Sequence, residues 1–270
     1  MKAIVLGCGG SGGVPLIGNV WGSCNPKNKK NKRTRVSILV KSKKTAILVD
    51  CSPDMREQLL KAKVKRINAV LITHAHADHV HGIDDFRSLN RSMNQDIDLY
   101  ADKNTLKILK RRFDYVFKPL VPQAKGFYYK PCLLAHRTKE KFKIGDVDVV
   151  SFIQKHGYSE SLGYRFGDLA YSTDVSDFSA QSLSKLRGIK VWIVDCLRLK
   201  PHPSHSHLKR TLSWIKKIKP ERAILTHLNH EVDYDELSKS LPPGVEVGFD
   251  GMKITSVSYT HLTLPTNREV

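Results

Sequence analysis

The sequence has few of the features that mark secreted or membrane proteins. Its five cysteines are an odd number, are widely scattered and form no C-x-x-C pair, so neither a disulfide framework nor a cysteine-rich zinc knuckle is expected. No apolar run approaches the roughly 18 to 20 residues that span a bilayer. The first residues, MKAIVLG, enter a strand at once, without a signal-peptide pattern. We therefore expect a cytoplasmic protein that does not enter a membrane.

Acidic residues are scarce relative to basic ones. Asp and Glu number 26 against 45 Lys and Arg, which gives a net charge of +19. A field of that sign would concentrate polyanions or phosphorylated small molecules near the surface, but an evenly solvated, lysine-rich surface explains the same count. Hydrophobic residues at 40% and charged residues at 26% of the 270 residues are globular values, which exclude a disordered or fibrous chain. We expect one domain over residues 1–256.

A dense group of potential metal ligands follows an apolar run. Residues 68–73, NAVLIT, predict a buried strand. The loop that leaves its carboxyl end carries His74, His76, Asp78 and His79. Imidazoles and carboxylates are both good ligands for zinc and similar divalent ions. In the pattern H-x-H-x-D-H, alternate residues can point one way and the neighbouring pair another, so one loop could supply two adjacent metal ions.

Three polar residues in the second half of the chain also stand directly after apolar strands. They are His156, Asp174 and His227, the last of which follows RAILT at residues 222–226. Taken singly, each would more often be a structural residue than a ligand. Their shared position at strand ends predicts a common rim with the first group. Strands that alternate with helices, such as the amphipathic residues 207–218, predict a layered α/β fold.

Asp50 is a candidate for a supporting role at this rim. It ends the apolar strand of residues 45–50, TAILVD. From such a position a carboxylate can orient a metal-bound imidazole through its second nitrogen. An ordinary polar residue at a strand end explains the same position equally well.

Three residues near the amino terminus are candidates for contacts with substrate. Arg33 and Arg35 lie just before a predicted strand, where a guanidinium could bind a phosphate with two hydrogen bonds. Ser11 lies in the glycine-rich residues 7–13, GCGGSGG. No amphipathic helix follows that segment, so we interpret it as a loop near the active site rather than a nucleotide-binding turn.

The order of these ligands resembles that of the metallo-β-lactamase fold hydrolases. The resemblance rests on H-x-H-x-D-H at residues 74–79 followed by His156, Asp174 and His227. Within that superfamily, the chain resembles the cyclic phosphate phosphodiesterases of phosphonate breakdown in four segments. They are LGCGGSGGVP at residues 6–15, NVWGSC at 19–24, HVHGIDD at 79–85 and TH at 226–227. The resemblance covers roughly residues 1–255 and implies a four-layer αββα sandwich.

The resemblance also implies a binuclear metal centre with Zn²⁺ or Mn²⁺. One ion would be held by His74, His76 and His156, the other by Asp78, His79 and His227, with Asp174 bridging the two. Two ions about 3.5 to 4 Å apart can lower the pKa of a bridging water from 15.7 toward about 7 and stabilise the attacking and leaving oxygens of an in-line displacement. We therefore expect a phosphodiesterase in which the bridging hydroxide attacks a small phosphodiester. A cyclic ribose phosphate is the substrate we favour. We count Asp78 among the catalytic residues.

A leaving alkoxide needs a proton, and a histidine-rich segment can supply it. The segment PHPSHSH, residues 201–207, contains His202, His205 and His207. An unperturbed histidine pKa near 6.5 suits general acid catalysis at neutral pH, and related enzymes place a histidine in this region. We predict His205 as the general acid and His202 as the second choice, because His207 is explained at least as well by the start of a helix.

Two other functions use the same ligands. An RNA-processing nuclease of the transfer-RNA 3′-processing type would bind RNA in a salt-dependent way, with the basic and aromatic residues 113–137 as its surface. The chain lacks the long glycine-rich insertion expected of that group's RNA-gripping arm, so a nucleic acid is not the favoured partner. A non-catalytic metal-binding protein of a cofactor pathway is disfavoured by the complete set of seven ligands. A small phosphorylated substrate is the expected partner, and a homodimer is compatible with this interpretation.

The carboxyl-terminal residues need a separate explanation. Residues 257–266, VSYTHLTLPT, resemble the translation of a sequencing adaptor. We therefore expect residues 257–270 to be a non-native tail and exclude His261 from the candidate site.

Overall fold

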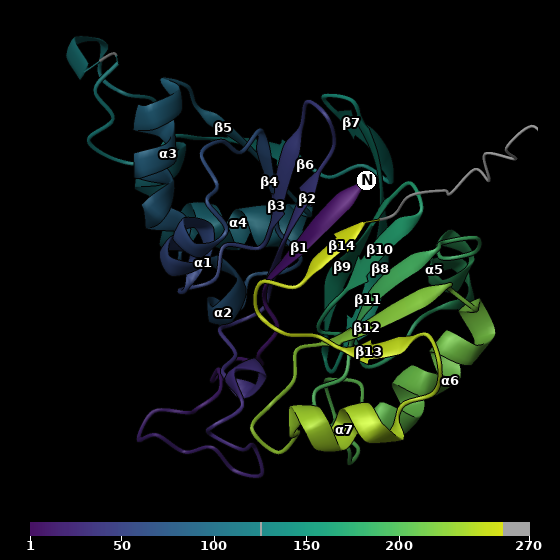
Figure 1. Cartoon of the computed structure of the whole chain (residues 1–270). Helices are drawn as coiled ribbons and strands as arrows, with labels where there is room; N and C mark the ends of the chain where they lie inside the picture. The colour runs from purple at the N-terminus through teal and green to yellow at the C-terminus, as the bar shows by residue number, and fades with distance from the viewer. Residues whose placement is uncertain (125, 256–270) are drawn as a thin grey trace, which may run out of the picture.

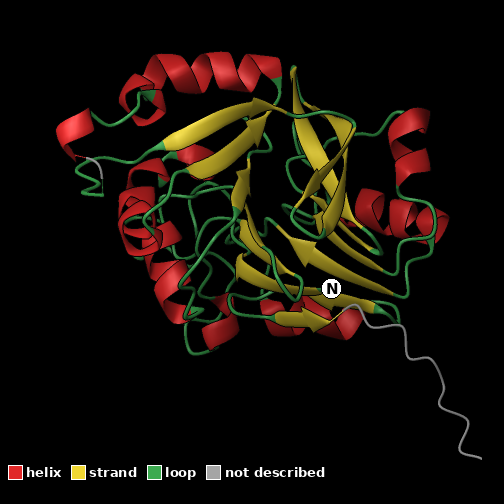
Figure 2. Cartoon of the chain, turned by 90° about the horizontal axis from the view of Figure 1, so that it is seen from above, coloured by secondary structure: helices red, strands yellow, loops and turns green. Residues whose placement is uncertain are grey.

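Two seven-stranded sheets face each other in the computed structural model, which describes residues 1–124 and 126–255. Helices cover the outer face of each sheet, so the described chain has four layers (Figure 1 and Figure 2). The predicted αββα sandwich is confirmed. The predicted non-native tail, with His261, lies outside the described residues.

The first sheet comes from the amino-terminal half and one late strand. Its strands are β1 (Lys2–Gly7), β2 (Ser37–Lys41), β3 (Ala46–Val49), β4 (Ala69–Leu71), β5 (Ile97–Ala101), β6 (Leu133–Arg137) and β14 (Lys253–Thr255). Their order is β14-β1-β2-β3-β4-β5-β6. Pairing is antiparallel from β14 to β3 and parallel from β3 to β6. The parallel strands therefore deliver the residues that follow them to one edge.

The second sheet has the same division into an antiparallel and a parallel part. Its strands are β7 (Lys141–Ile144), β8 (Val147–His156), β9 (Ser159–Phe166), β10 (Leu169–Ser172), β11 (Val191–Asp195), β12 (Arg222–Thr226) and β13 (Val245–Val247). Their order is β13-β12-β11-β10-β9-β8-β7, antiparallel from β7 to β10 and parallel from β10 to β13. β7 and β8 pair as an antiparallel hairpin.

Helices are divided between the two outer faces. Hydrophobic clusters pack α1 (Met55–Lys61), α3 (Phe86–Met93) and α4 (Lys103–Arg112) on the first sheet, and α5 (Ala180–Lys185), α6 (Leu208–Ile218) and α7 (Tyr234–Ser240) on the second. The short α2 (Ala77–Val80) and the 3-10 turns η1 (Lys29–Asn31), η2 (Ile83–Asp85), η3 (Asp114–Phe117) and η4 (Pro122–Ala124) lie in connections. Within the described ranges, no helix has the length and apolar character needed to cross a membrane.

Both faces of the central strands are buried, which explains their continuous apolar sequences. Successive side chains of a strand point to opposite faces. In β11, Ile193 packs between the sheets, whereas Trp192 packs against the outer helices. In β3, Ile47 faces the other sheet, whereas Leu48 faces the helices. Strands covered on both faces lose the usual alternation of apolar and polar residues.

Leu48→Ala should lower the free energy of unfolding by about 2–5 kcal/mol, because it leaves a cavity in a packed layer. Leu134→Ala is the matched control, since Leu134 lies on β6 of the same sheet and is 49% exposed, whereas Leu48 is 0% exposed. The control should change stability by about 0.5 kcal/mol or less. Urea denaturation measures both. Equal losses in the two variants would contradict this account of the layers.

Candidate metal centre

The ends of strands from both sheets meet at one rim of the sandwich. His74 and His76 lie on the loop after β4, and α2 carries Asp78 and His79 directly behind them. The second sheet contributes three more residues. His156 is the last residue of β8, Asp174 lies shortly after β10, and His227 directly follows β12. The structure thus gathers all seven predicted ligands in two adjoining clusters.

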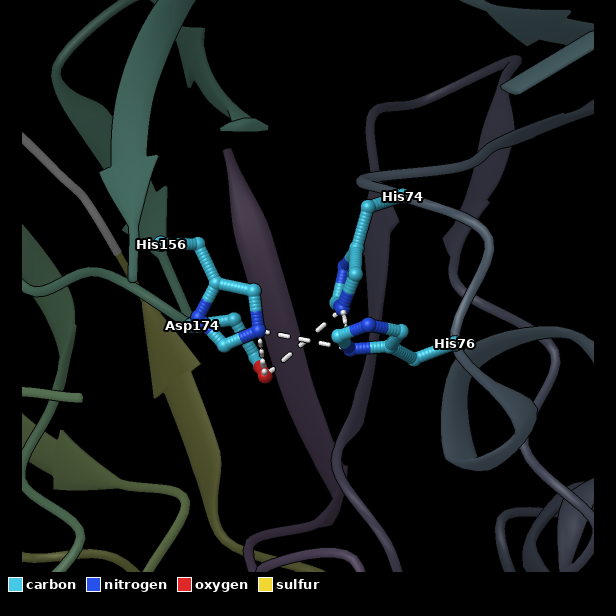
Figure 3. A group of neighbouring side chains, drawn as sticks. All are labelled: His74, His76, His156 and Asp174. Carbon is cyan, nitrogen blue, oxygen red and sulfur yellow. Dashed lines mark hydrogen bonds and ion pairs between the residues drawn. The ribbon is translucent and has the colours of Figure 1, made fainter. Parts of the chain in front are cut away.

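The first cluster contains three histidines and one carboxylate (Figure 3). His74 Nε2 lies 2.8 Å from His76 Nδ1, and His156 Nε2 lies 3.3 Å from the same atom. Asp174 Oδ1 is 3.8 Å from His74 Nε2 and 3.7 Å from His156 Nε2. The four side chains converge from both sheets on one small volume.

The second cluster shares Asp174 with the first. Asp174 Oδ2 lies 3.1 Å from His79 Nε2 and 3.4 Å from His227 Nε2. Asp78 Oδ2 lies 3.4 Å from His79 Nε2 and 3.8 Å from His227 Nε2. The two oxygens of Asp174 therefore face different clusters.

The donor atoms fit a binuclear metal site. His79 Nε2 and His227 Nε2 are buried and have no hydrogen-bond partner among the residues that the structure describes, which is a costly arrangement for polar atoms. A tetrahedral ion with bonds of about 2.0–2.1 Å keeps its ligands roughly 3.4 Å apart. The separations of 3.1–3.8 Å in the second cluster bracket that value. An ion held by these four residues would give each of these two nitrogens a partner.

Hydrogen bonds behind the cluster fix the orientation of His79. Its Nδ1 lies 2.7 Å from Asp50 Oδ2, so the opposite ring nitrogen faces Asp78 and Asp174. Asp50 is fully buried and also accepts hydrogen bonds from the backbone N–H and the hydroxyl of Thr73, at 2.8 and 2.9 Å. A carboxylate held in this way fixes both the tautomer and the direction of a ligating imidazole.

Burial and neighbouring charges act on the cluster in opposite directions. Burial holds the pKa of His74 well below its usual value. Burial also opposes protonation of His227, but Asp174 and other carboxylates raise its pKa to about 9. Burial would raise the pKa of Asp174, yet His227 and His79 hold that pKa well below its usual range. Asp174 is therefore an ionised carboxylate that attracts positive charge from both clusters.

His205 lies against the second cluster. Its ring stacks on that of His227, with centroids 4.6 Å apart and 14° between the planes. Its Nδ1 lies 3.2 Å from Asp195 Oδ2. The His202 ring is next, with its centroid 5.2 Å from that of His205. His207 instead directly precedes α6 as its N-cap residue.

Sequence reasoning missed Asp195. This residue is fully buried at the end of β11 and touches His205. Its signal was its position, because it ends the apolar run KVWIVD as Asp50 ends TAILVD. The two sheets thus each contribute an aspartate that contacts a histidine of the rim.

The three amino-terminal residues expected to contact substrate differ in their exposure. Arg33 is 1% exposed, and its Nη1 donates to the backbone oxygens of Asn229 and Val232, at 3.1 and 2.8 Å. Its guanidinium therefore joins two loops, and this buried position conflicts with the expected phosphate contact. Arg35 pairs with Asp54 at 3.3 Å and keeps part of its surface free. Ser11 is exposed in the glycine-rich loop.

A cavity of about 960 Å³ lies beside the first cluster. His74 and His76 form part of its wall, and α4, β8, β9 and α5 supply much of the rest. Nothing in the local sequence pattern predicted this cavity, because its walls come from segments that are far apart along the chain.

Comparison with known proteins identifies the family. Residues 45–228 match the family described as the beta-lactamase superfamily domain, which is more than half of the chain. The chain therefore belongs to the metallo-β-lactamase superfamily. A crystal structure described as a new diphosphatase from the PhnP family is 34% identical, with a TM-score of 0.86, and the match covers 94% of this chain and 97% of that chain. The chain thus groups with the PhnP-like metallo-hydrolases.

Two further relatives extend the comparison. A Porphyromonas gingivalis protein named octanoyltransferase is 34% identical over 260 residues, which cover 94% of this chain and 51% of that protein. The chain therefore spans about half the length of this relative. Zn(2+)-bound PqqB from Methylobacterium extorquens has a TM-score of 0.73 at 19% identity, over 94% of this chain and 100% of that chain. This last likeness concerns the fold.

Asp50→Asn should weaken zinc binding by roughly 10- to 100-fold, because His79 would lose the carboxylate that orients it. Competition with a chromophoric chelator measures the affinity. Asp148→Asn is the matched control, since Asp148 is an exposed residue of β8 outside both clusters. Unchanged zinc affinity in Asp50→Asn would show that the hydrogen bond to His79 does not support metal binding.

Proposed function

We propose that the chain is a binuclear metal-dependent phosphodiesterase that hydrolyses a small phosphodiester. The observation that carries the proposal is the position of Asp174, whose two oxygens face two adjoining ligand clusters. Two divalent ions, Zn²⁺ or Mn²⁺, would polarise a phosphoryl oxygen and lower the pKa of water toward about 7. The 34% identical diphosphatase of the PhnP family supports a phosphorus–oxygen bond as the target.

The residues of the chain divide the work between holding the ions and moving protons. His74, His76 and His156 would hold one ion, and Asp78, His79 and His227 the other, with Asp174 between them. Asp78 and Asp174 also place negative charge where the ions gather. The buried position of His79 and His227, at 0% and 1% exposure, would keep bulk water away from an ion held there.

His205 is our candidate for the group that gives a proton to the leaving oxygen. Asp195 holds its Nδ1, which leaves Nε2 for the substrate. The ring lies beside both clusters, because it stacks on His227 and meets the edge of His156 with centroids 4.7 Å apart. His202 stands next to His205 and is the second candidate for this role.

Metal-loaded protein should hydrolyse bis(p-nitrophenyl) phosphate, and Asp174→Ala should lower the rate by roughly a hundredfold or more, since the variant loses the shared ligand. Absorbance of p-nitrophenolate measures turnover, and elemental analysis counts the bound metal. Asp148→Asn should keep both. If the native protein binds two ions but cleaves no phosphodiester, the proposed reaction is wrong, and thioester hydrolysis becomes the next reaction to test.

His205→Ala should slow hydrolysis of a diester with an alkoxide leaving group, such as a dialkyl or nucleoside alkyl phosphate, by roughly 10²–10⁴-fold. The same variant should affect p-nitrophenyl esters much less, because p-nitrophenolate leaves without a proton. His207→Ala, outside the clusters, is the matched control. If His202→Ala rather than His205→Ala shows this dependence on the leaving group, His202 is the acid.

A further inference from the structure

Hydrogen bonds hold the backbone of Asp174 on both sides of that residue. The Ser161 hydroxyl donates to the backbone oxygen of Asp174 at 2.8 Å, and the N–H of Val175 donates to Asp195 Oδ2 at 2.9 Å. The φ of Asp174 is 53°, a conformation that persists in residues other than glycine only where the surrounding structure fixes it. Ser161 and Asp195 are therefore two of the groups that keep Asp174 in this conformation.

Gln154 supports Ser161 from the neighbouring strand. The two residues lie opposite each other in the pairing of β8 with β9. Gln154 Nε2 donates to Ser161 Oγ at 3.0 Å and to the backbone oxygen of Thr173 at 2.9 Å. A carbonyl oxygen only accepts, so the amide turns its NH₂ group this way, and the Ser161 hydroxyl is left to donate to Asp174. The direction of each hydrogen bond from Gln154 to Asp174 is thereby fixed.

This hydrogen-bond network is closed off from solvent. Gln154, Ser161 and Thr173 are all buried. Gly163 leaves room for the amide, because a Cβ at that position would lie 2.5 Å from Gln154 Oε1. A buried network is rigid when every member is paired and costly when one partner is lost. Removal of the Ser161 hydroxyl would leave the backbone oxygen of Asp174 without its donor, so we expect Asp174 to shift.

The same strand, β9, also contacts the segment that leads to the ligands of the first sheet. The N–H of Leu162 donates to the backbone oxygen of Thr73 at 2.9 Å, and the Tyr164 hydroxyl donates to that of Ile72 at 2.8 Å. Thr73 directly precedes His74. Successive residues of β9 thus bind the backbone beside His74 and the backbone of Asp174. The position of β9 therefore sets the separation of these two ligands.

We propose that Ser161 and Gln154 are positioning residues, which direct the two oxygens of Asp174 at the two ligand clusters and so fix the spacing of two bound metal ions. The inference rests on the proposed function, because it requires a binuclear centre with Asp174 as the shared ligand. Asp174 Oδ1 lies 3.7 Å from His156 Nε2, and Oδ2 lies 3.1 Å from His79 Nε2. A rotation of the Asp174 backbone would move both oxygens at once. Both ions should therefore depend on a hydroxyl that belongs to neither cluster.

Metal binding without turnover tests this role. The zinc affinity of Ser161→Ala, measured by competition with a chromophoric chelator, should fall by roughly tenfold or more for both ions, as is typical when a group behind a metal ligand is removed. Ser161→Thr keeps the hydroxyl and should keep most of the affinity. Ser151→Ala is the matched control, because Ser151 is also a buried serine of the cavity wall and donates to the backbone oxygen of Lys139 at 2.9 Å. It should bind zinc as the native protein does.

The magnetic coupling of two Mn²⁺ ions distinguishes positioning from a general loss of stability. Two Mn²⁺ ions that share a carboxylate ligand are exchange-coupled, which makes their electron paramagnetic resonance spectrum differ from that of isolated ions. Native protein and Ser151→Ala, saturated with Mn²⁺, should give the coupled spectrum. Ser161→Ala and Gln154→Leu should show weaker coupling at the same metal content. Gln154 is 0% exposed, so a change in its variant cannot come from a lost contact with a ligand in the cavity.

The outcomes separate this inference from the proposed function. Native zinc affinity and native coupling in Ser161→Ala and Gln154→Leu would overturn the inference, even if both variants unfold at a lower temperature. If the native protein binds two uncoupled ions, Asp174 does not bridge them, and the inference is wrong whatever the rate of hydrolysis. If both variants disturb a coupled pair but the native protein cleaves no bis(p-nitrophenyl) phosphate, the inference stands and the proposed reaction is wrong.

Discussion

The site depends on three residues whose backbones adopt an uncommon conformation where strands end. Asp50, Asp174 and His227 have φ values of 62°, 53° and 61°. These values lie in the left-handed region, which residues other than glycine rarely adopt. Such positions cost about 1–3 kcal/mol each and persist where the surrounding structure fixes them. All three follow apolar strands whose packing is complete. The packed sheets thus offset the cost of aiming these side chains into the rim.

The two sheets serve the rim in similar ways. Each places an aspartate at the end of an apolar strand, and each aspartate contacts a histidine of the rim: Asp50 lies 2.7 Å from His79, and Asp195 lies 3.2 Å from His205. The sheets are also joined at the site itself, since the N–H of Leu162 donates to the backbone oxygen of Thr73 at 2.9 Å. Movement of one sheet against the other would therefore separate the ligands of both clusters.

Features that depend on local sequence could be predicted, and features that depend on distant contacts could not. The central strands were predictable because burial on both faces leaves continuous apolar runs. Six of the seven candidate ligands stood out because they follow such a run, whereas His156 ends the alternating strand β8. The buried position of Arg33 could not be predicted, because its partners, Asn229 and Val232, are about 200 residues away in sequence. The cavity had no local signal for the same reason, since its wall needs α4 and β6 to lie side by side.

The two clusters differ in their contact with the cavity, because His74 and His76 of the first cluster form part of its wall. His76 is exposed and lines the cavity, whereas His79, Asp174 and His227 are buried. A ligand in the cavity would meet the two histidines of its wall together with Lys103, Arg112 and Arg137, whereas His205 touches both clusters through His156 and His227. In the proposed reaction, the cavity and His205 would therefore act on different parts of the substrate.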